Sequence, residues 1–129
     1  MVGPPGVVLD TDALLAYSQR AESVGYQLVL VADRGESALV PAACLATAYQ
    51  RVTDDGWRYL DILTSLEYVV VTPLTREDCS VLGGWARTLG LDTAQAAIQA
   101  AAHPITPLMT SQRDLVTTFL PKEWPIIDI

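Results

Sequence analysis

The chain has 129 residues, half of them hydrophobic, and carries a formal net charge of −7. This length predicts a single domain over residues 1–129, and the hydrophobic content excludes intrinsic disorder. The fully apolar runs are far shorter than the roughly 20 residues that a membrane-spanning helix needs. No basic segment typical of a secretion signal opens the sequence, so we expect a cytoplasmic protein. The eight Lys and Arg residues are scattered, which argues against non-specific nucleic-acid binding.

The first half of the chain predicts alternating strands and helices. Val7–Asp10 is a β-branched apolar run typical of a buried strand, and the helix expected over 13–17 has Thr11 and Asp12 before it as capping groups. Residues 21–32 fit either a strand or a helix, because strand-forming side chains there also recur at helical spacing. The remaining elements expected in this half are a strand at 38–41 and helices at 42–52 and 57–66.

The second half continues the alternation. Residues 68–72 form the clearest strand pattern, and Thr75 with Asp78 resembles a capping box that opens a helix reaching about Leu89. An Ala-rich helix over 93–102 is expected to be central, because small side chains allow neighbours to approach closely, and part of its alanine excess could serve a homodimer contact. The last expected elements are a strand at 107–110, a helix at 114–120 and a strand at 125–129. Alternating strands and helices predict an α/β fold with a mainly parallel sheet and helices on both faces.

The two cysteines, Cys44 and Cys79, are not spaced as metal ligands usually are. The chain has one histidine, His103, that could complete a site with them. Structural zinc is held by four Cys or His ligands, so a zinc site is not expected. We expect both cysteines to be buried free thiols.

The end of the first strand is the strongest candidate for a functional site. In open parallel sheets, ligands bind beyond the carboxyl ends of the strands. Asp10 stands at such an end, and Thr11 and Asp12 already provide capping groups for the helix that follows. The sequence therefore predicts a functional role for Asp10 and a capping role for Asp12.

Four segments, in the same order along the chain, resemble the four sequence motifs of PIN domains. They are Val7–Ala16, Leu39–Tyr49, Leu89–Ala97 and Pro107–Leu115. The resemblance implies a three-layer α/β/α sandwich. It also implies kinship with metal-dependent ribonucleases, including toxins of toxin–antitoxin pairs, in which three or four carboxylates gather around one or two Mg²⁺ or Mn²⁺ ions.

This sequence departs from the family pattern at three of the four acidic positions. Asp10 matches, but the positions aligned to the other acids are Thr47, Gln95 and Gln112. Mg²⁺ is a hard cation that prefers charged oxygen ligands, so one carboxylate would bind it weakly. The resemblance thus predicts a degenerate metal site, with no cofactor bound, and weak or absent nuclease activity.

Three nearby acids leave an alternative open. Asp12, Asp92 and Asp114 could substitute for the missing carboxylates, or they could simply stand near helix N-termini, where negative charge is favourable. In the first case the protein is a Mg²⁺- or Mn²⁺-dependent ribonuclease that acts on RNA, with an antitoxin as partner. In the second it acts as a homodimer or by binding another protein. A doubly wound domain that binds an unrelated small ligand is the third reading.

Overall fold

The computed structural model describes residues 2–103 and 105–129, without the side chain of residue 54. The strands are β1 (Pro5–Leu9), β2 (Ser37–Pro41), β3 (Val69–Thr72), β4 (Leu108–Thr110) and β5 (Ile126–Asp128). The α-helices are α1 (Thr11–Ser18), α2 (Glu22–Asp33), α3 (Ala42–Arg51), α4 (Asp54–Ser65), α5 (Cys79–Leu89), α6 (Leu91–Ala102) and α7 (Arg113–Val116). A short 3₁₀ turn, η1 (Arg76–Asp78), precedes α5.

The five strands form one sheet in the order β3-β2-β1-β4-β5, and every neighbouring pair is parallel. Val8 of β1 pairs with Leu39 on one side and with Leu108 on the other. The chain builds outward from β1 through β2 and β3, and then returns to the opposite side of β1 for β4 and β5. The direction of building therefore reverses between β1 and β4, which is where parallel sheets form their binding crevices.

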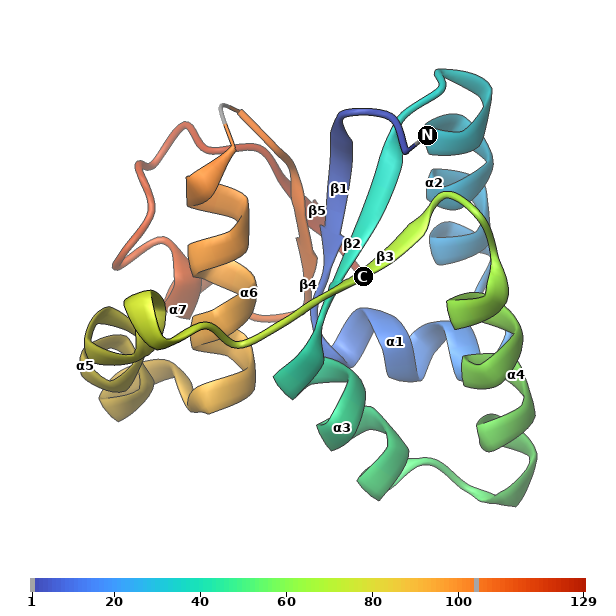
Figure 1. Ribbon diagram of the computed structural model, residues 1–129, viewed down its shortest axis with the longest axis horizontal. Helices are drawn as coiled ribbons and strands as arrows, with labels where there is room; N and C mark the ends of the chain where they lie inside the picture. Colours follow the sequence, from blue (N-terminus) through green and yellow to red (C-terminus); the bar gives the residue numbers. More distant parts are fainter. Residues whose placement is uncertain (1, 104) are drawn as a thin grey trace.

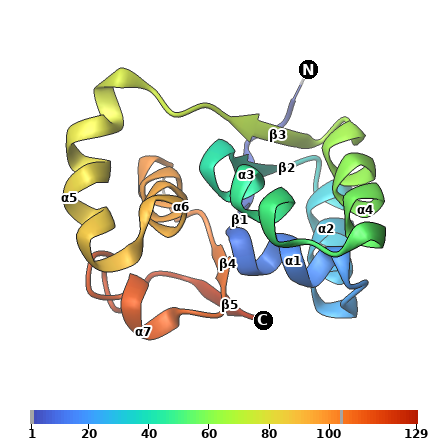
Figure 2. The ribbon, with the colours of Figure 1, turned by 90° about the horizontal axis from the view of Figure 1, so that it is seen from below.

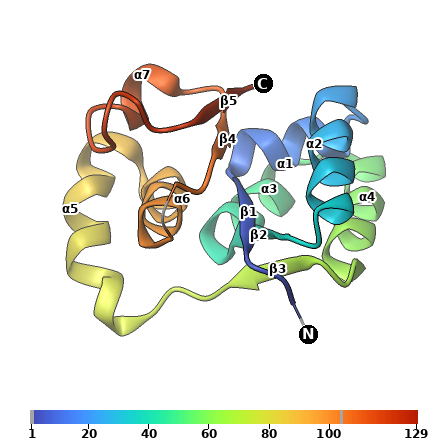
Figure 3. The same ribbon diagram turned by 90° about the horizontal axis from the view of Figure 1, so that it is seen from above.

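Helices cover both faces of the sheet, as Figures 1, 2 and 3 show. On one face α6 contacts β1, β2 and β4, with α5 packed outside it. On the other face, α1 contacts β1 and β4, α2 contacts β2, and α4 contacts β3. The predicted α/β/α sandwich with a parallel sheet is confirmed.

The Ala-rich helix α6 lies in the core, as the sequence predicts. Ala94, Ala96, Ala97 and Ala100 have no exposed surface, so a second copy of the chain cannot reach them. The alanine excess therefore serves the internal packing of α6 against the sheet, α3 and α5. Only the exposed alanines at the end of this helix, Ala101 and Ala102, remain open to a dimer contact.

The ambiguous segment at 21–32 is the helix α2. Its helical spacing decides the outcome, because Val24, Leu28 and Val31 are buried on one face while Tyr26 and Val29 are exposed on the other. No helix in residues 2–103 and 105–129 is both long and apolar enough to cross a membrane.

Three local expectations are wrong. Thr75 makes no side-chain capping bond, and the chain there forms η1 before α5 begins. The helix expected over 114–120 ends at Val116 and continues as turns. Cys44 is buried, but Cys79 is exposed because it lies in the first turn of α5, on the outer layer of the sandwich.

Candidate active site at the carboxyl edge of the sheet

Asp10 lies where β1 ends, beside the end of β4, at the point where the order of strand building reverses. Its side chain is 1% exposed. One carboxylate oxygen, Oδ1, accepts a hydrogen bond from the Ala13 amide at 2.9 Å, and the Thr110 hydroxyl also bonds to the carboxylate. The site thus joins residues from the ends of two strands that are far apart in sequence.

Asp10 is itself the N-cap of α1, contrary to the expectation that Thr11 and Asp12 cap this helix. The extended backbone of β1 continues through Asp10, so α1 begins at Thr11 and Asp12 falls in its first turn. An N-cap residue needs an extended backbone and a side-chain oxygen that reaches the amide two or three residues on. Asp10 meets both conditions, so the conformation of the strand end selects the cap.

Burial changes the acidity of this carboxyl. Loss of hydration raises the pKa of Asp10 from 3.8 to about 6, and the charges of Asp12 and Asp92 push it in the same direction. The hydrogen bonds from Thr110 and Ala13 oppose the rise without cancelling it. Near neutral pH, Asp10 is therefore a buried carboxylate close to its titration range.

The structure brings Asp12 and Asp92 close enough to Asp10 to affect its charge. The Thr11 hydroxyl donates to Oδ2 of Asp92, and the Ser111 hydroxyl and the Gln112 side chain donate to Oδ2 of Asp12. Each of these carboxylates thus already accepts hydrogen bonds from neighbouring side chains.

Asp92 and Asp114 both stand in the first turn of a helix, but neither is the cap. Gly90 precedes α6 and Gln112 precedes α7 as the N-cap residues, and neither makes a side-chain capping bond. Asp114 is exposed and does not contribute to the Asp10 charge cluster. The structure therefore gathers two of the three candidate substitute acids and leaves the third outside.

The neutral residues at the remaining family positions are engaged in local bonds. The Thr47 hydroxyl donates to the Ala43 carbonyl, one turn earlier in α3, at 2.7 Å. Gln112 donates through Nε2 to Asp12 at 3.4 Å, and its backbone amide donates to the Thr110 hydroxyl at 3.0 Å.

Gln95 is buried, with 1% of its surface exposed, and uses both ends of its amide. Oε1 accepts from the Ala43 amide at 2.8 Å, and Nε2 donates to the Thr72 carbonyl at 3.3 Å. Thr72 ends β3 and Ala43 follows β2, so both stand at the carboxyl ends of strands, but the sequence does not predict that Gln95 bonds to them. Beside this link, the Cys44 thiol donates to the Asp92 carbonyl at 3.0 Å.

No three Asp, Glu, His or Cys side chains within the described part of the chain are grouped so that they could hold a metal ion. The donors at this edge are one buried carboxylate that caps a helix, two further carboxylates that accept side-chain hydrogen bonds, and neutral amides and hydroxyls.

Comparison with known proteins supports the fold. No family model matches the chain, and no curated protein matches it. A solved structure, the crystal structure of VapBC2 from Rickettsia felis bound to a DNA fragment from their promoter, superimposes with a TM-score of 0.68. The superposition covers 95% of this chain and 97% of that chain, at 16% sequence identity. This chain has a PIN-like fold.

In this fold, Asp10, Gln95 and Gln112 lie at one edge of the sheet. The resemblance to the PIN-domain motifs predicts the site at the same edge. At 16% identity the likeness carries the fold alone. What the edge can do chemically follows from the residues that occupy it here.

Proposed function

We propose that this chain is a PIN-like domain with a degenerate metal site, which has little or no nuclease activity and acts by binding another protein or a second copy of itself. The observation that carries the proposal is the bonding of Gln95. Its amide joins the Ala43 amide to the Thr72 carbonyl, a task that a carboxylate could not perform because it cannot donate. At the position where the family resemblance predicts a metal-binding acid, the neutral Gln95 side chain instead makes these two structural hydrogen bonds.

The charge at the site supports the same conclusion. Asp10 is the single family acid present, and a pKa of about 6 leaves part of its population protonated near neutral pH. Neither Thr47 nor Gln112 adds negative charge.

Exposed apolar side chains on the α2 and α4 layer support a role in protein binding. Tyr26 and Val29 on α2 are 62% and 57% exposed, and Trp57 on α4 is 52% exposed. Both helices cover the same face of the sheet (Figure 2). Contiguous exposed apolar patches mark protein interaction sites, and in this proposal the three side chains contribute to such a patch.

A Mg²⁺- or Mn²⁺-dependent ribonuclease, acting as a toxin with an antitoxin partner, is the second candidate. Two observations favour it: the likeness of the fold to the VapBC2 structure, and the closeness of Asp12 and Asp92 to Asp10. In this case the three acids would hold one ion after a rearrangement of their present hydrogen bonds.

A calorimetric titration with Mn²⁺ separates the two candidates. We expect the wild-type chain and the Asp10→Asn variant to behave alike, with affinity no tighter than about millimolar. About micromolar binding that Asp10→Asn abolishes would establish the ribonuclease instead. The same pair serves as a control for RNA cleavage, since cleavage that persists in Asp10→Asn comes from a contaminant.

The binding half of the proposal needs a separate measurement. Sedimentation velocity over a range of concentrations tests for a second copy, and co-purification with the product of a small neighbouring gene tests for a partner protein. We expect one of these complexes, and we expect Tyr26→Ser with Val29→Ser to weaken it. A chain that stays monomeric and forms no complex with that product would contradict the proposed mode of action.

A further inference from the structure

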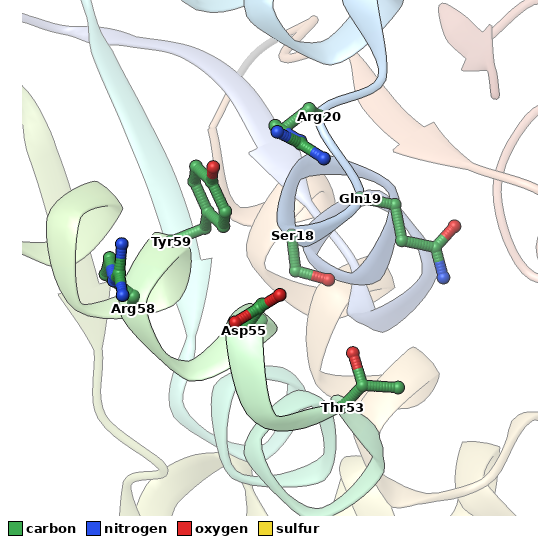
Figure 4. A pocket seen from close by; sticks show the side chains of 8 residues that line it. Ser18, Gln19, Arg20, Thr53, Asp55, Arg58 and Tyr59 are labelled. Atoms are coloured by element: carbon green, nitrogen blue, oxygen red, sulfur yellow. The ribbon is translucent and has the colours of Figure 1, made fainter.

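A charged hollow lies between the end of α1 and the beginning of α4, and it shares no residue with the Asp10 site (Figure 4). Its volume is about 360 Å³. The residues that line it are Ser18, Gln19, Arg20, Thr53, Asp55, Gly56, Arg58 and Tyr59. The charged residues among them are Arg20, Arg58 and Asp55, and the side chains of Arg20 and Arg58 lie on either side of Tyr59 (Figure 4).

Arg20 occupies a backbone position that does not favour arginine. Its φ of 63° is left-handed, and it follows the C-cap of α1, where glycine is usual. The guanidinium carbon lies 5.6 Å from the centre of the Tyr59 ring, a cation–π distance that holds the side chain along the hollow. Arg20 makes no ion pair with any side chain that the structure describes.

Gly56 lies in the hollow where a larger residue would not fit. A Cβ atom at this position would lie 2.8 Å from Cβ of Val52 and 3.4 Å from Cβ of Ser18. A side chain at this position would therefore collide with Val52, at the end of α3, and would touch Ser18, at the end of α1. Around it, Ser18 and Gln19 at the end of α1 face Thr53 and Asp55 at the start of α4, as Figure 4 shows.

We propose that this hollow binds a sugar phosphate, either free or as part of a mononucleotide. Arginine binds phosphate oxygens through paired, charge-assisted hydrogen bonds, which assigns the phosphate to Arg20 and Arg58. The Asp55 carboxylate opposes a bare anion but accepts hydrogen bonds from sugar hydroxyls, so the two signs of charge together fit a ligand that carries both groups. A volume of about 360 Å³ lies within the range of small-molecule sites.

An NMR titration that follows the amide chemical shifts tests this proposal. Ribose 5-phosphate is the probe, and ribose, inorganic phosphate and adenosine 5′-monophosphate are titrated for comparison. We expect ribose 5-phosphate to move the resonances of Ser18, Gln19 and Tyr59 with about millimolar affinity. Ribose and phosphate alone should bind at least about ten-fold more weakly, because each lacks one half of the contacts. Tighter binding of adenosine 5′-monophosphate than of ribose 5-phosphate would identify the ligand as a mononucleotide, and the reverse order would identify it as a free sugar phosphate.

Three variants make the test specific. Arg20→Gly removes the guanidinium while relieving the left-handed backbone, so the fold is kept and affinity should fall by about ten-fold or more, as it should in Arg58→Gln. Asp55→Asn should weaken ribose 5-phosphate but strengthen inorganic phosphate. Arg87→Gln, an exposed position on α5, is the matched control and should change neither.

The proposal is overturned if ribose 5-phosphate causes no saturable shifts at the hollow, or if Arg87→Gln weakens binding as much as Arg58→Gln. It is also overturned if a single-stranded RNA oligomer binds through Arg20 and Arg58 while the sugar phosphate does not, since the arginines then belong to a nucleic-acid surface. Asp10→Asn should leave sugar phosphate binding unchanged, which keeps this test independent of the metal titration.

Discussion

Gln95 and Ala43 are 52 residues apart in sequence, and the Ala43 amide donates to the Gln95 side-chain oxygen at 2.8 Å. The first amides of a helix have no acceptor within it, and the N-cap of α3 is Pro41, which offers no side-chain oxygen. Gln95 supplies that acceptor from α6, and its amide nitrogen bonds to the Thr72 carbonyl at the end of β3. One neutral side chain therefore connects α6, the start of α3 and the end of β3.

Replacing Gln95 with leucine should destabilise the protein strongly. The change keeps a similar volume but leaves the Ala43 amide and the Thr72 carbonyl without their partner, and each buried unmade bond costs about 1–3 kcal/mol. We expect the free energy of unfolding in urea to fall by about 2–4 kcal/mol. Gln50→Leu, at an exposed position on α3, is the control and should change it by less than about 0.5 kcal/mol. Equal effects at the two positions would show that the Gln95 bonds carry no net stability.

Asparagine in place of Asp10 should stabilise the protein above neutral pH. The pKa of Asp10 is raised in the folded state to about 6 from 3.8, so its favourable contribution is complete below pH 3.8 and is lost as the pH rises through about 6. Asparagine keeps the N-cap bond to Ala13 without the buried charge. We expect Asp10→Asn to be more stable than the wild type by about 2–3 kcal/mol near pH 8.

The pH dependence is the control for this prediction. At about pH 4 and below, Asp10 is neutral in the folded protein, so the advantage of the asparagine variant should nearly vanish. Urea unfolding of both proteins at the two pH values measures the difference. A stability gap that stays constant with pH would mean that Asp10 is not the group that titrates.

Two glycines should respond to alanine in opposite ways. At Gly56 the new Cβ would meet Cβ of Val52 at 2.8 Å, which forces the start of α4 away from the end of α3 and should cost about 1–3 kcal/mol. At Gly84, in α5, a Cβ meets nothing within 4 Å, so alanine should stabilise the helix by about 0.5–1 kcal/mol. Thermal and urea unfolding of both variants measure these changes. A stabilising Gly56→Ala would show that the contact between Gly56 and Val52 is not tight.

The two thiols should differ sharply in reactivity. Cys44 is fully buried and burial raises the pKa of its thiol, whereas Cys79 is exposed on α5. Because the thiolate is the reactive form, a thiol reagent should modify Cys79 rapidly in the folded protein and Cys44 only upon unfolding. Cys79→Ser should remove the rapid phase. Rapid reaction of both thiols in the folded wild type would indicate frequent opening around α3.

The sequence alone was sufficient for the layers of the fold and for placing Asp10 at the carboxyl edge of the sheet. Apolar β-branched runs such as Val7–Leu9 mark buried parallel strands, and their alternation with amphipathic segments leaves few topologies open. The same local pattern identified Asp10, because an acid directly after a buried strand stands at the edge where parallel sheets bind ligands.

Tertiary structure alone decided what the residues at that edge do. The backbone angle at the end of β1 makes Asp10 the helix cap, and the crossing from β3 to α6 sets Gln95 beside Ala43. It also places Asp12 and Asp92 near Asp10 and leaves Asp114 in solvent. Periodicity describes which face of a segment is buried, but bonds between residues tens of positions apart depend on how the whole chain packs, and no local pattern contains that information.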